Sequence, residues 1–367
     1  MIYAETEHAI RNTYEESVLA MIFPWRFHMP ADDHILLSHG SGGLMSHELI
    51  RDVFARHFAN PHLDARNDSV VLNDLPPGRV ALTTDSYVVH PIEFPGGDIG
   101  KLAVCGTVND LAVVGAEPRY LTAGFILEEG LPLETLERIV ASMAATAQAA
   151  GVQIVTGDTK VVERGAADGL FINTAGVGVV PADLALSPAN LRPGDVLLIN
   201  GTMGDHGMAV MMQREELAFT STLESDCAPL NGLIAALLNA AVPGAVRCLR
   251  DATRGGLVTV LNEWADHGVG IDITENAIPV REEVRAVSEL LGLDPLYAAN
   301  EGKVVAAVAP EAAEDALAAL KAHPLGREAA IIGEVTKAHS GRVVLETPYG
   351  AHRILQMLTG APLPRIC

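Results

Sequence analysis

Residues 94–110 have the sequence FPGGDIGKLAVCGTVND, in which a glycine-containing turn leads into a run of small apolar residues. The run predicts a helix over 99–114, and Gly115 follows at the place where glycine favours a helix end. Asn109 and Asp110 put polar side chains near the end of this apolar run. The flanking sequence alternates between stretches typical of strands and of helices, which indicates the α/β (α+β) class.

Outward from this stretch, the first half of the chain combines strands and helices. A glycine-rich loop at 38–43 precedes an expected helix at 44–58. A helix at 132–150 has a proline near its first turn and Gly151 just after its end. Strands are expected at 69–72, 79–84, 120–127, 152–155 and 170–180.

A polar, proline-containing stretch at 181–193 interrupts the pattern and predicts a boundary between two domains. The second domain begins with an expected strand at 195–200 and a glycine-rich turn at 201–207. Its helices are expected at 229–241, 255–267, 280–291 and 311–322, and its further strands at 270–273, 303–308 and 330–335. The predicted organisation is a poorly ordered extension at 1–33, an N-terminal domain at 34–185, a C-terminal domain at 186–345 and a tail at 346–367.

Composition excludes several classes of protein. The 367 residues are 49% hydrophobic and 19% charged, which is typical of a chain with a sizeable core. A net charge of −21 opposes binding to nucleic acid or to an anionic membrane surface. The four cysteines form no C-x-x-C pair, and no apolar stretch approaches the length of a membrane span. We therefore expect a cytoplasmic protein without a disulfide framework.

Several carboxylates stand where apolar runs end, namely Asp68, Asp85, Asp110, Asp158 and Asp251. Strand ends and loops commonly supply the hard oxygen ligands that Mg²⁺ requires. Backbone N–H groups at 40–43 and 204–207, together with Lys160, are candidates for phosphate binding. Each of these residue types is also an ordinary turn or N-cap residue, so the interpretation depends on the whole set. The chain has no G-x-x-x-x-G-K-[ST] motif and is not a P-loop protein.

Two further residues stand out. Glu301 precedes a strongly apolar strand, where it could act as a general base, bind a metal or be a solvated turn residue. The last six residues are PLPRIC, and their two prolines exclude a helix or a central strand, so we expect an extended tail. The terminal Cys367 is either incidental or a sulfur nucleophile on a mobile arm.

From residue 34 to residue 367 the chain resembles the HypE family of [NiFe]-hydrogenase maturation factors. This family lies within the wider group of aminoimidazole ribonucleotide synthetase-like (PurM-like) ATP enzymes. Several long motifs occur together and in order, and residues 1–33 lie outside them. The motifs are SHGSGG (38–43), TTDSYVV (83–89), FPGGDIGKLAVCGTVND (94–110), IVTGDTKVV (154–162), RDATRGG (250–256), NEGK (300–303) and the terminal PRIC.

The resemblance implies a fold and a reaction. A PurM-like N-terminal domain would pair its sheet with that of a second subunit into a barrel, and a C-terminal α/β domain would follow. ATP and Mg²⁺ would bind at a cleft that involves the homodimer interface. The carbamoyltransferase HypF would load Cys367 with a carbamoyl group, and ATP-dependent dehydration would leave a thiocyanate there. The cyano group would then pass to iron held by the HypC–HypD complex.

Carried over onto this sequence, the resemblance also implies roles for individual residues. Cys367, Asp85, Lys160 and Glu301 are the expected catalytic residues, with Glu301 as the base that takes the N–H proton. The expected Mg²⁺ ligands are Asp68, Asp85, Asp110 and Asp251. The expected nucleotide-binding residues are His39, Ser41, Gly42, Gly43, Asn109, Asp158, Thr159 and Lys160.

Other functions require different features. A selenophosphate synthetase needs a reactive cysteine or selenocysteine near its glycine-rich loop, and residues 38–41 contain none. A purine-biosynthetic ligase has no need of the PRIC tail. An assembly scaffold whose tail only docks on partners stays open as an alternative. ATP turnover that disappears with Cys367 would exclude the scaffold.

Overall fold

The computed structural model describes residues 33–64, 69–214, 222–360 and 366. The chain divides into a unit at Met1–His34 and a second unit at Ile35–Cys367, and the fold below is that of the second unit. Apart from Asp33, the predicted extension at 1–33 lies outside the described residues. The same holds for Asp68 and Cys367.

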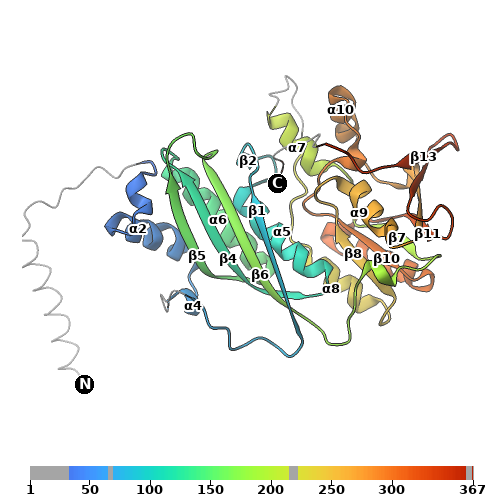
Figure 1. The fold of residues 1–367 in the computed structure, drawn as a ribbon, viewed down its shortest axis with the longest axis horizontal. Coiled ribbons are helices and arrows are strands. Elements are labelled where there is room, and N and C mark those ends of the chain that lie inside the picture. Colours follow the sequence, from blue (N-terminus) through green and yellow to red (C-terminus); the bar gives the residue numbers. More distant parts are fainter. Residues whose placement is uncertain (1–32, 65–68, 215–221, 361–365, 367) are drawn as a thin grey trace, which may run out of the picture. The chain divides into compact units, whose positions relative to one another are not determined.

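A four-stranded sheet forms the first half of this unit, with the strand order β1-β6-β4-β5 (Figure 1). Strand β6 pairs antiparallel with both β1 and β4, whereas β4 and β5 are parallel. The strands are β1 (Arg79–Tyr87), β4 (Glu117–Glu128), β5 (Gln153–Val162) and β6 (Leu170–Val180).

Helices α5 (Ile99–Val113) and α6 (Leu133–Ala150) cover one face of this sheet (Figure 1). Asp98 caps α5, since its Oδ1 accepts hydrogen bonds from the N–H groups of Gly100 and Lys101 at 2.8 and 3.0 Å. A Cβ at Gly176 on β6 would lie 2.7 Å from Thr107 Cγ2. Glycine at this position therefore lets the helix approach the sheet closely.

The opposite face of the sheet carries exposed apolar side chains. On β1, Val80 and Leu82 are 64% and 74% exposed, and Ile126 on β4 is also exposed. Thr83 and Asp85 alternate with them along β1 and are turned toward α5. We call the apolar side chains of Val80, Leu82 and Ile126 the outer face of the sheet.

A seven-stranded sheet organises the second half, with the order β13-β12-β9-β11-β7-β10-β8. Its strands are β7 (Val196–Ile199), β8 (Val246–Asp251), β9 (Gly270–Thr274), β10 (Val304–Val308), β11 (Ala330–Thr336), β12 (Val343–Glu346) and β13 (His352–Leu355). The helices of this half are α7 (Asp205–Arg214), α8 (Asn231–Ala240), α9 (Gly256–Ala265), α10 (Glu282–Leu291) and α11 (Ala313–Ala322).

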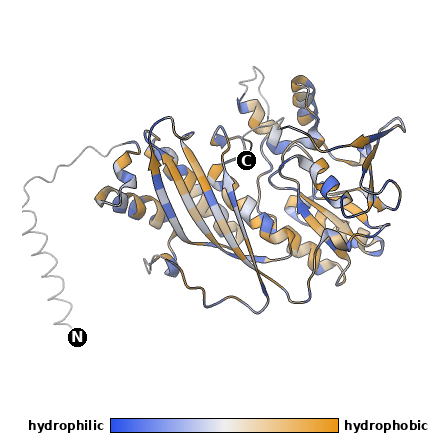
Figure 2. Cartoon of the chain, viewed as in Figure 1, coloured by the Kyte–Doolittle hydropathy of each residue, from blue (hydrophilic) through white to orange (hydrophobic). Residues whose placement is uncertain are grey.

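Strand β10 shows why the sequence forms this layered core. All five of its residues are buried, and Figure 2 shows the continuous hydrophobic colour of the strands in this region. Val305 and Ala307 pack in the cluster that contains Trp264 of α9. Val304, Ala306 and Val308 pack on the other side, with α8 and α11. A strand covered on both faces is apolar throughout.

The structure confirms the α/β class, and most predicted elements match observed ones. Residues 69–72 form no strand, which corrects that prediction. The strand expected at 152–155 extends to Val162, so 157–160 lie within edge strand β5 instead of in a turn. Strands β8, β12 and β13 were not predicted, and β13 lies within the segment expected to be a tail. None of the helices in the described part of the chain is long and apolar enough to cross a membrane.

Candidate functional site

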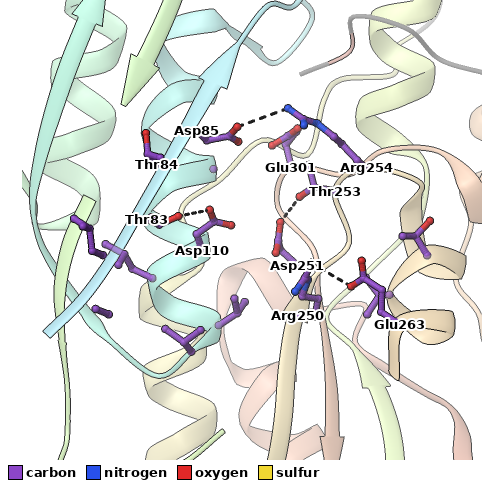
Figure 3. Close-up of a pocket in the computed structure, with 18 of the residues that line it drawn as sticks. Thr83, Thr84, Asp85, Asp110, Arg250, Asp251, Thr253, Arg254, Glu263 and Glu301 are labelled. Atoms are coloured by element: carbon purple, nitrogen blue, oxygen red, sulfur yellow. Dashed lines mark hydrogen bonds and ion pairs between the residues drawn. The ribbon is translucent and has the colours of Figure 1, made fainter. Parts of the chain in front are cut away.

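A pocket of about 580 Å³ lies where β1, α5 and the segments after β8 meet (Figure 3). Besides Glu263 of α9, four carboxylates line it: Asp85 on β1, Asp110 on α5, Asp251 at the end of β8 and Glu301 before β10. Figure 3 shows these side chains arranged around one space. The sequence analysis selected all four, and the fold brings them together from both halves of the unit.

Local hydrogen bonds and ion pairs orient three of the carboxylates. Thr83 precedes Asp85 by two positions on β1, so both face the pocket, and Thr83 Oγ1 donates to Asp110 Oδ2 at 2.9 Å. The Thr253 hydroxyl donates to Asp251. Arg254 lies 3.6 Å from Asp85 Oδ1. Asp110 and Asp85 are therefore each held by a residue from another element, and Asp251 is held by the turn that follows its strand.

Electrostatics in the pocket are dominated by negative charge. The pKa of Asp110 is raised to about 6, first by burial and then by the nearby charges of Asp251 and Asp85, against the lowering effects of the Thr83 bond and Arg250. Arg250 is itself 3.1 Å from Glu263. A cation placed among these carboxylates would relieve the repulsion that raises the pKa of Asp110.

Glu301 is the most strongly perturbed of the four. It is 3% exposed, and its Oε1 has no hydrogen-bond partner among the described residues. Burial raises its pKa well above the usual range, with further contributions from Cys227 and Asp226. A buried carboxyl oxygen without a partner is costly and indicates a missing ligand. The alternative of a solvated turn residue is therefore wrong for Glu301.

Asn109 supports the segment that carries Glu301. Its Nδ2 donates to the carbonyl oxygens of Ala228 and Glu301 at 3.1 and 3.2 Å, and its Oδ1 accepts from Leu230 N at 2.7 Å. The side chain is buried, and its amide is fully used in joining α5 to the second half. Asn109 therefore positions Glu301 in this structure.

The other predicted nucleotide-binding residues lie at the far edge of the four-stranded sheet. Lys160 on β5 pairs with Asp158 at 2.7 Å, and both side chains are largely exposed. The loop at 38–43 packs closely on β5, since a Cβ at Gly40 would lie 2.8 Å from Val161 N. These residues are His39, Ser41, Gly42, Gly43, Asp158, Thr159 and Lys160. Because β5 and β1 are opposite edges of this sheet, these residues and the carboxylate pocket of the same chain lie apart.

In the second glycine-rich turn, two of the four amides at 204–207 that were predicted as candidates for phosphate binding are used within the chain. Gly204 N donates to Asn300 Oδ1 at 2.8 Å, and Gly207 N donates to Ala299 O at 3.0 Å. These bonds hold the segment that leads to Glu301. These two amides of the turn therefore have a structural role.

The donor chemistry of the pocket fits Mg²⁺, although its present spacing does not form a closed ligand set. Among the described residues, no three His, Cys, Asp or Glu side chains are grouped so as to hold a metal ion. Asp85, Asp110 and Asp251 nevertheless supply hard oxygen atoms of the kind that Mg²⁺ takes.

A buried polar cluster beside the chain end was missed by the sequence analysis. Ile366 is 3% exposed, and its carbonyl oxygen lies 2.9 Å from His206 Nε2. Asp226 accepts from Glu301 N at 3.0 Å and pairs with Lys303 at 3.2 Å. The acidic residues that precede Cys227, in the sequence LESDC at 223–227, are the signal that could have pointed to this cluster.

Comparison with known proteins is consistent with this architecture. The models of AIR synthase related protein match residues 66–180 with the N-terminal domain and residues 192–346 with the C-terminal domain. Carbamoyl dehydratase HypE from Azotobacter vinelandii is 58% identical over 330 residues, which cover 90% of this chain and 96% of the relative. HypE from Escherichia coli K12 is 54% identical, with 91% and 100% covered.

Solved structures show the same similarity. A crystal structure of hydrogenase maturation protein HypE in complex with ATP aligns with a TM-score of 0.86 and 53% identity, covering 90% of this chain and 99% of the other. A HypE–HypF complex contains a chain that aligns with a TM-score of 0.74 and 52% identity, covering 84% and 99%. The chain belongs to the HypE carbamoyl dehydratases of the AIR synthase related family.

Proposed function

We propose that this chain is an ATP-dependent carbamoyl dehydratase of hydrogenase maturation, which converts a carbamoyl group on the Cys367 thiol to a thiocyanate. The observation that carries the proposal is the position of the chain end. Ile366, which directly precedes Cys367, is held by His206. His206 lies in the field of Asp226, and Asp226 binds the backbone of Glu301. The residue that precedes Cys367 is therefore held by a side chain that is linked through Asp226 to the proposed base.

The reaction removes one water from the tethered carbamoyl group. The C–O bond breaks, the C–N bond becomes a triple bond, and both N–H protons leave. A carbonyl oxygen is a poor leaving group. When bound, ATP supplies the phosphoryl group with which this oxygen departs as phosphate, and Mg²⁺ screens the phosphate charge. The thiol sulfur keeps its bond to carbon throughout.

Glu301 would accept an N–H proton as the C≡N bond forms. A general base becomes neutral when it takes a proton, and burial favours the neutral form of a carboxyl group. The same burial that raises the pKa of Glu301 therefore stabilises the product of proton transfer. In the reactant state Glu301 must be ionised, so dehydration should accelerate as pH rises.

Asp85, Asp110 and Asp251 are the proposed Mg²⁺ ligands in the described part of the chain, with Asp68 as a fourth candidate outside it. They come from both halves of the unit. A cation held by these carboxylates would supply positive charge to the phosphate groups.

A second copy of the chain would complete the nucleotide site. The group around Lys160 and the carboxylate pocket lie at opposite edges of one sheet, and the outer face of that sheet carries exposed apolar side chains. Pairing two outer faces would bury Val80, Leu82 and Ile126 and bring residues of one subunit toward the pocket of the other. We accordingly propose a homodimer that binds ATP with residues of both subunits.

Two partners follow from the chemistry of the reaction. A carbamoyltransferase must load Cys367, and a relative forms a complex with HypF, so HypF is the proposed donor. An iron centre must accept the cyano group, for which we propose the HypC–HypD complex.

The intact mass of the protein after carbamoyl transfer tests the function. With ATP and Mg²⁺, the adduct on Cys367 should lose the mass of one water, and without ATP it should not. The Cys367→Ser variant should carry no such adduct. An unchanged adduct mass with ATP, despite bound nucleotide, would exclude the dehydratase and favour the scaffold.

A further inference from the structure

His206 contacts the end of the chain through a hydrogen bond that is buried on both sides. It lies in the first turn of α7 and is fully buried, and Ile366 is 3% exposed. His206 Nε2 is 2.9 Å from the Ile366 carbonyl oxygen. The Ile366 side chain belongs to the core cluster that contains Phe94, Val210 and Cys227. The penultimate residue is therefore seated by a polar and an apolar contact together.

The partners of His206 fix which ring nitrogen carries the proton. The Ile366 carbonyl can only accept, so Nε2 must donate to it. Nδ1 lies 2.8 Å from Ser225 Oγ, and Ser225 Oγ accepts from Cys227 N at 3.1 Å. The Ser225 hydroxyl is thus free to donate its proton to Nδ1. Burial lowers the pKa of His206, so the ring is neutral, as this arrangement requires.

The position of the ring is fixed by neighbours from other elements. The Phe94 ring meets the imidazole edge-on, with centroids 5.4 Å apart and planes at 83°. Ser225 N donates to Pro95 O at 2.8 Å, which joins the loop of Ser225 to the same turn. These contacts fix the imidazole independently of its bond to Ile366.

We propose that His206, oriented by Ser225, is a positioning residue that seats the C-terminal arm so that Cys367 is delivered to the site of Glu301. This inference rests on the proposed function for its consequence, but the seating itself is independent of catalysis. The Cα of Cys367 is about 3.8 Å from that of Ile366, so holding Ile366 confines the thiol. Loading by a transferase would require the hydrogen bond to open.

Three substitutions distinguish hydrogen-bond donation by His206 Nε2 from the simple packing of the His206 side chain. His206→Gln keeps an N–H donor close to the position of Nε2, whereas His206→Leu removes the donor and keeps the volume. Ser225→Ala removes the proton that Nδ1 accepts, so the ring can adopt the tautomer that repels the Ile366 carbonyl. Met208→Leu, at a buried position on the same helix, is the matched control.

The measurement is the alkylation rate of Cys367 in the folded homodimer, followed by mass spectrometry of the C-terminal peptide. Cys105, Cys227 and Cys248 are buried and provide the slow background. A buried carbonyl without its donor should shift the seated-to-released equilibrium, so His206→Leu should raise the rate about 5- to 150-fold. Ser225→Ala should give a smaller rise, and His206→Gln should stay close to wild type, as should Met208→Leu.

A second readout connects seating to the reaction. In single-turnover dehydration of carbamoylated protein, His206→Leu should lower the rate and leave the affinity for ATP unchanged. The Gln variant should restore most of the rate. A residue that only supports the fold would instead lower ATP affinity and melting temperature together, and Gln would not restore activity.

Two results would overturn the inference. One is an alkylation rate in folded His206→Leu equal to that of the control. The other, which needs no folded variant, is an NMR signal of the Nε2–H tautomer of His206 that is unchanged when residues 366–367 are deleted. If His206→Leu is alkylated faster than wild type, but the wild-type protein never dehydrates its adduct, the proposed function is refuted and the seating of the arm is not.

Discussion

Asp110→Asn should stabilise the protein while it impairs ATP turnover. Asparagine has the shape of aspartate, and its carbonyl oxygen can still accept the hydrogen bond from Thr83. The substitution therefore removes mainly a negative charge that stands near Asp251 and Asp85. A residue retained for catalysis commonly destabilises the fold that holds it.

The pKa of Asp110 gives the size of the effect. Its value is about 6 in the folded chain against a usual 3.8, and at about 1.4 kcal/mol per pKa unit the difference corresponds to about 3 kcal/mol. Asp110 is only partly buried, and solvent screening reduces the gain to about 1–3 kcal/mol. For a chain of this length that is roughly 1–4 °C in Tm.

The sign of the pH dependence follows from the raised pKa. The folded state binds the proton more tightly than the unfolded state, so the stabilising contribution is complete below about pH 3.8 and disappears as pH rises through about 6. Wild type should thus lose stability between about pH 4 and pH 7 relative to Asp110→Asn. The two proteins should differ little at the acidic end of this range.

Denaturant unfolding in EDTA, at several pH values, measures the difference. Asp195→Asn is the control of opposite sign, because Asp195 is buried and pairs with Arg247 at 3.3 Å, so losing its charge should destabilise the fold. Adding Mg²⁺ with ATP should stabilise wild type more than Asp110→Asn. If Asp110→Asn is no more stable than wild type at neutral pH, Asp110 is not electrostatically strained and the argument is wrong.

Glu301→Gln should bind ATP normally and fail to dehydrate the adduct, and the dehydration rate of the wild type should rise with pH as Glu301 ionises. Equal dehydration rates for Glu301→Gln and wild type, measured by quenched-flow mass spectrometry, would refute the role of Glu301 as base. Asp85→Asn should abolish ATP hydrolysis with an unchanged circular dichroism spectrum, and wild-type phosphate release would contradict this. Leu82→Asp should give a monomer by light scattering, whereas Val242→Asp, at another exposed apolar position, should not. Removing residues 1–33 should change neither dimerisation nor turnover, and a large drop in Tm would show that they pack on the body.

The sequence was sufficient to predict elements that are buried on most sides, because burial requires a continuous run of apolar residues. Helix α5 and strand β10 are apolar because they are covered on several sides, so their residues alone predicted them. Strand β5 was cut short in the prediction because residues 156–160, with the sequence TGDTK, are polar or glycine. It is an edge strand, where exposed polar side chains and glycine are tolerated.

The part of the site that could be predicted consists of acidic side chains whose position in the sequence indicates a chemical role. Asp85, Asp110, Asp251 and Glu301 stand at the ends of apolar runs, and the fold gathers them. The amides at 204–207 resembled a phosphate loop, but their partners lie about a hundred residues away in sequence. His206 was missed for the same reason, since Ser225 and Ile366 reach it only in the folded chain.

The two ends of the site are coupled through the proton affinity of Glu301. Burial is the main reason that its pKa is raised, but the charges of Asp251 and Asp85 contribute as well. Neutralising these two carboxylates with a cation would remove their share and lower the pKa of Glu301. Glu301 would then be ionised more often when metal and nucleotide are present than when they are absent. Glu301 would therefore be ready to accept a proton only when metal and nucleotide are bound. That is also the state in which the oxygen of the carbamoyl group can leave.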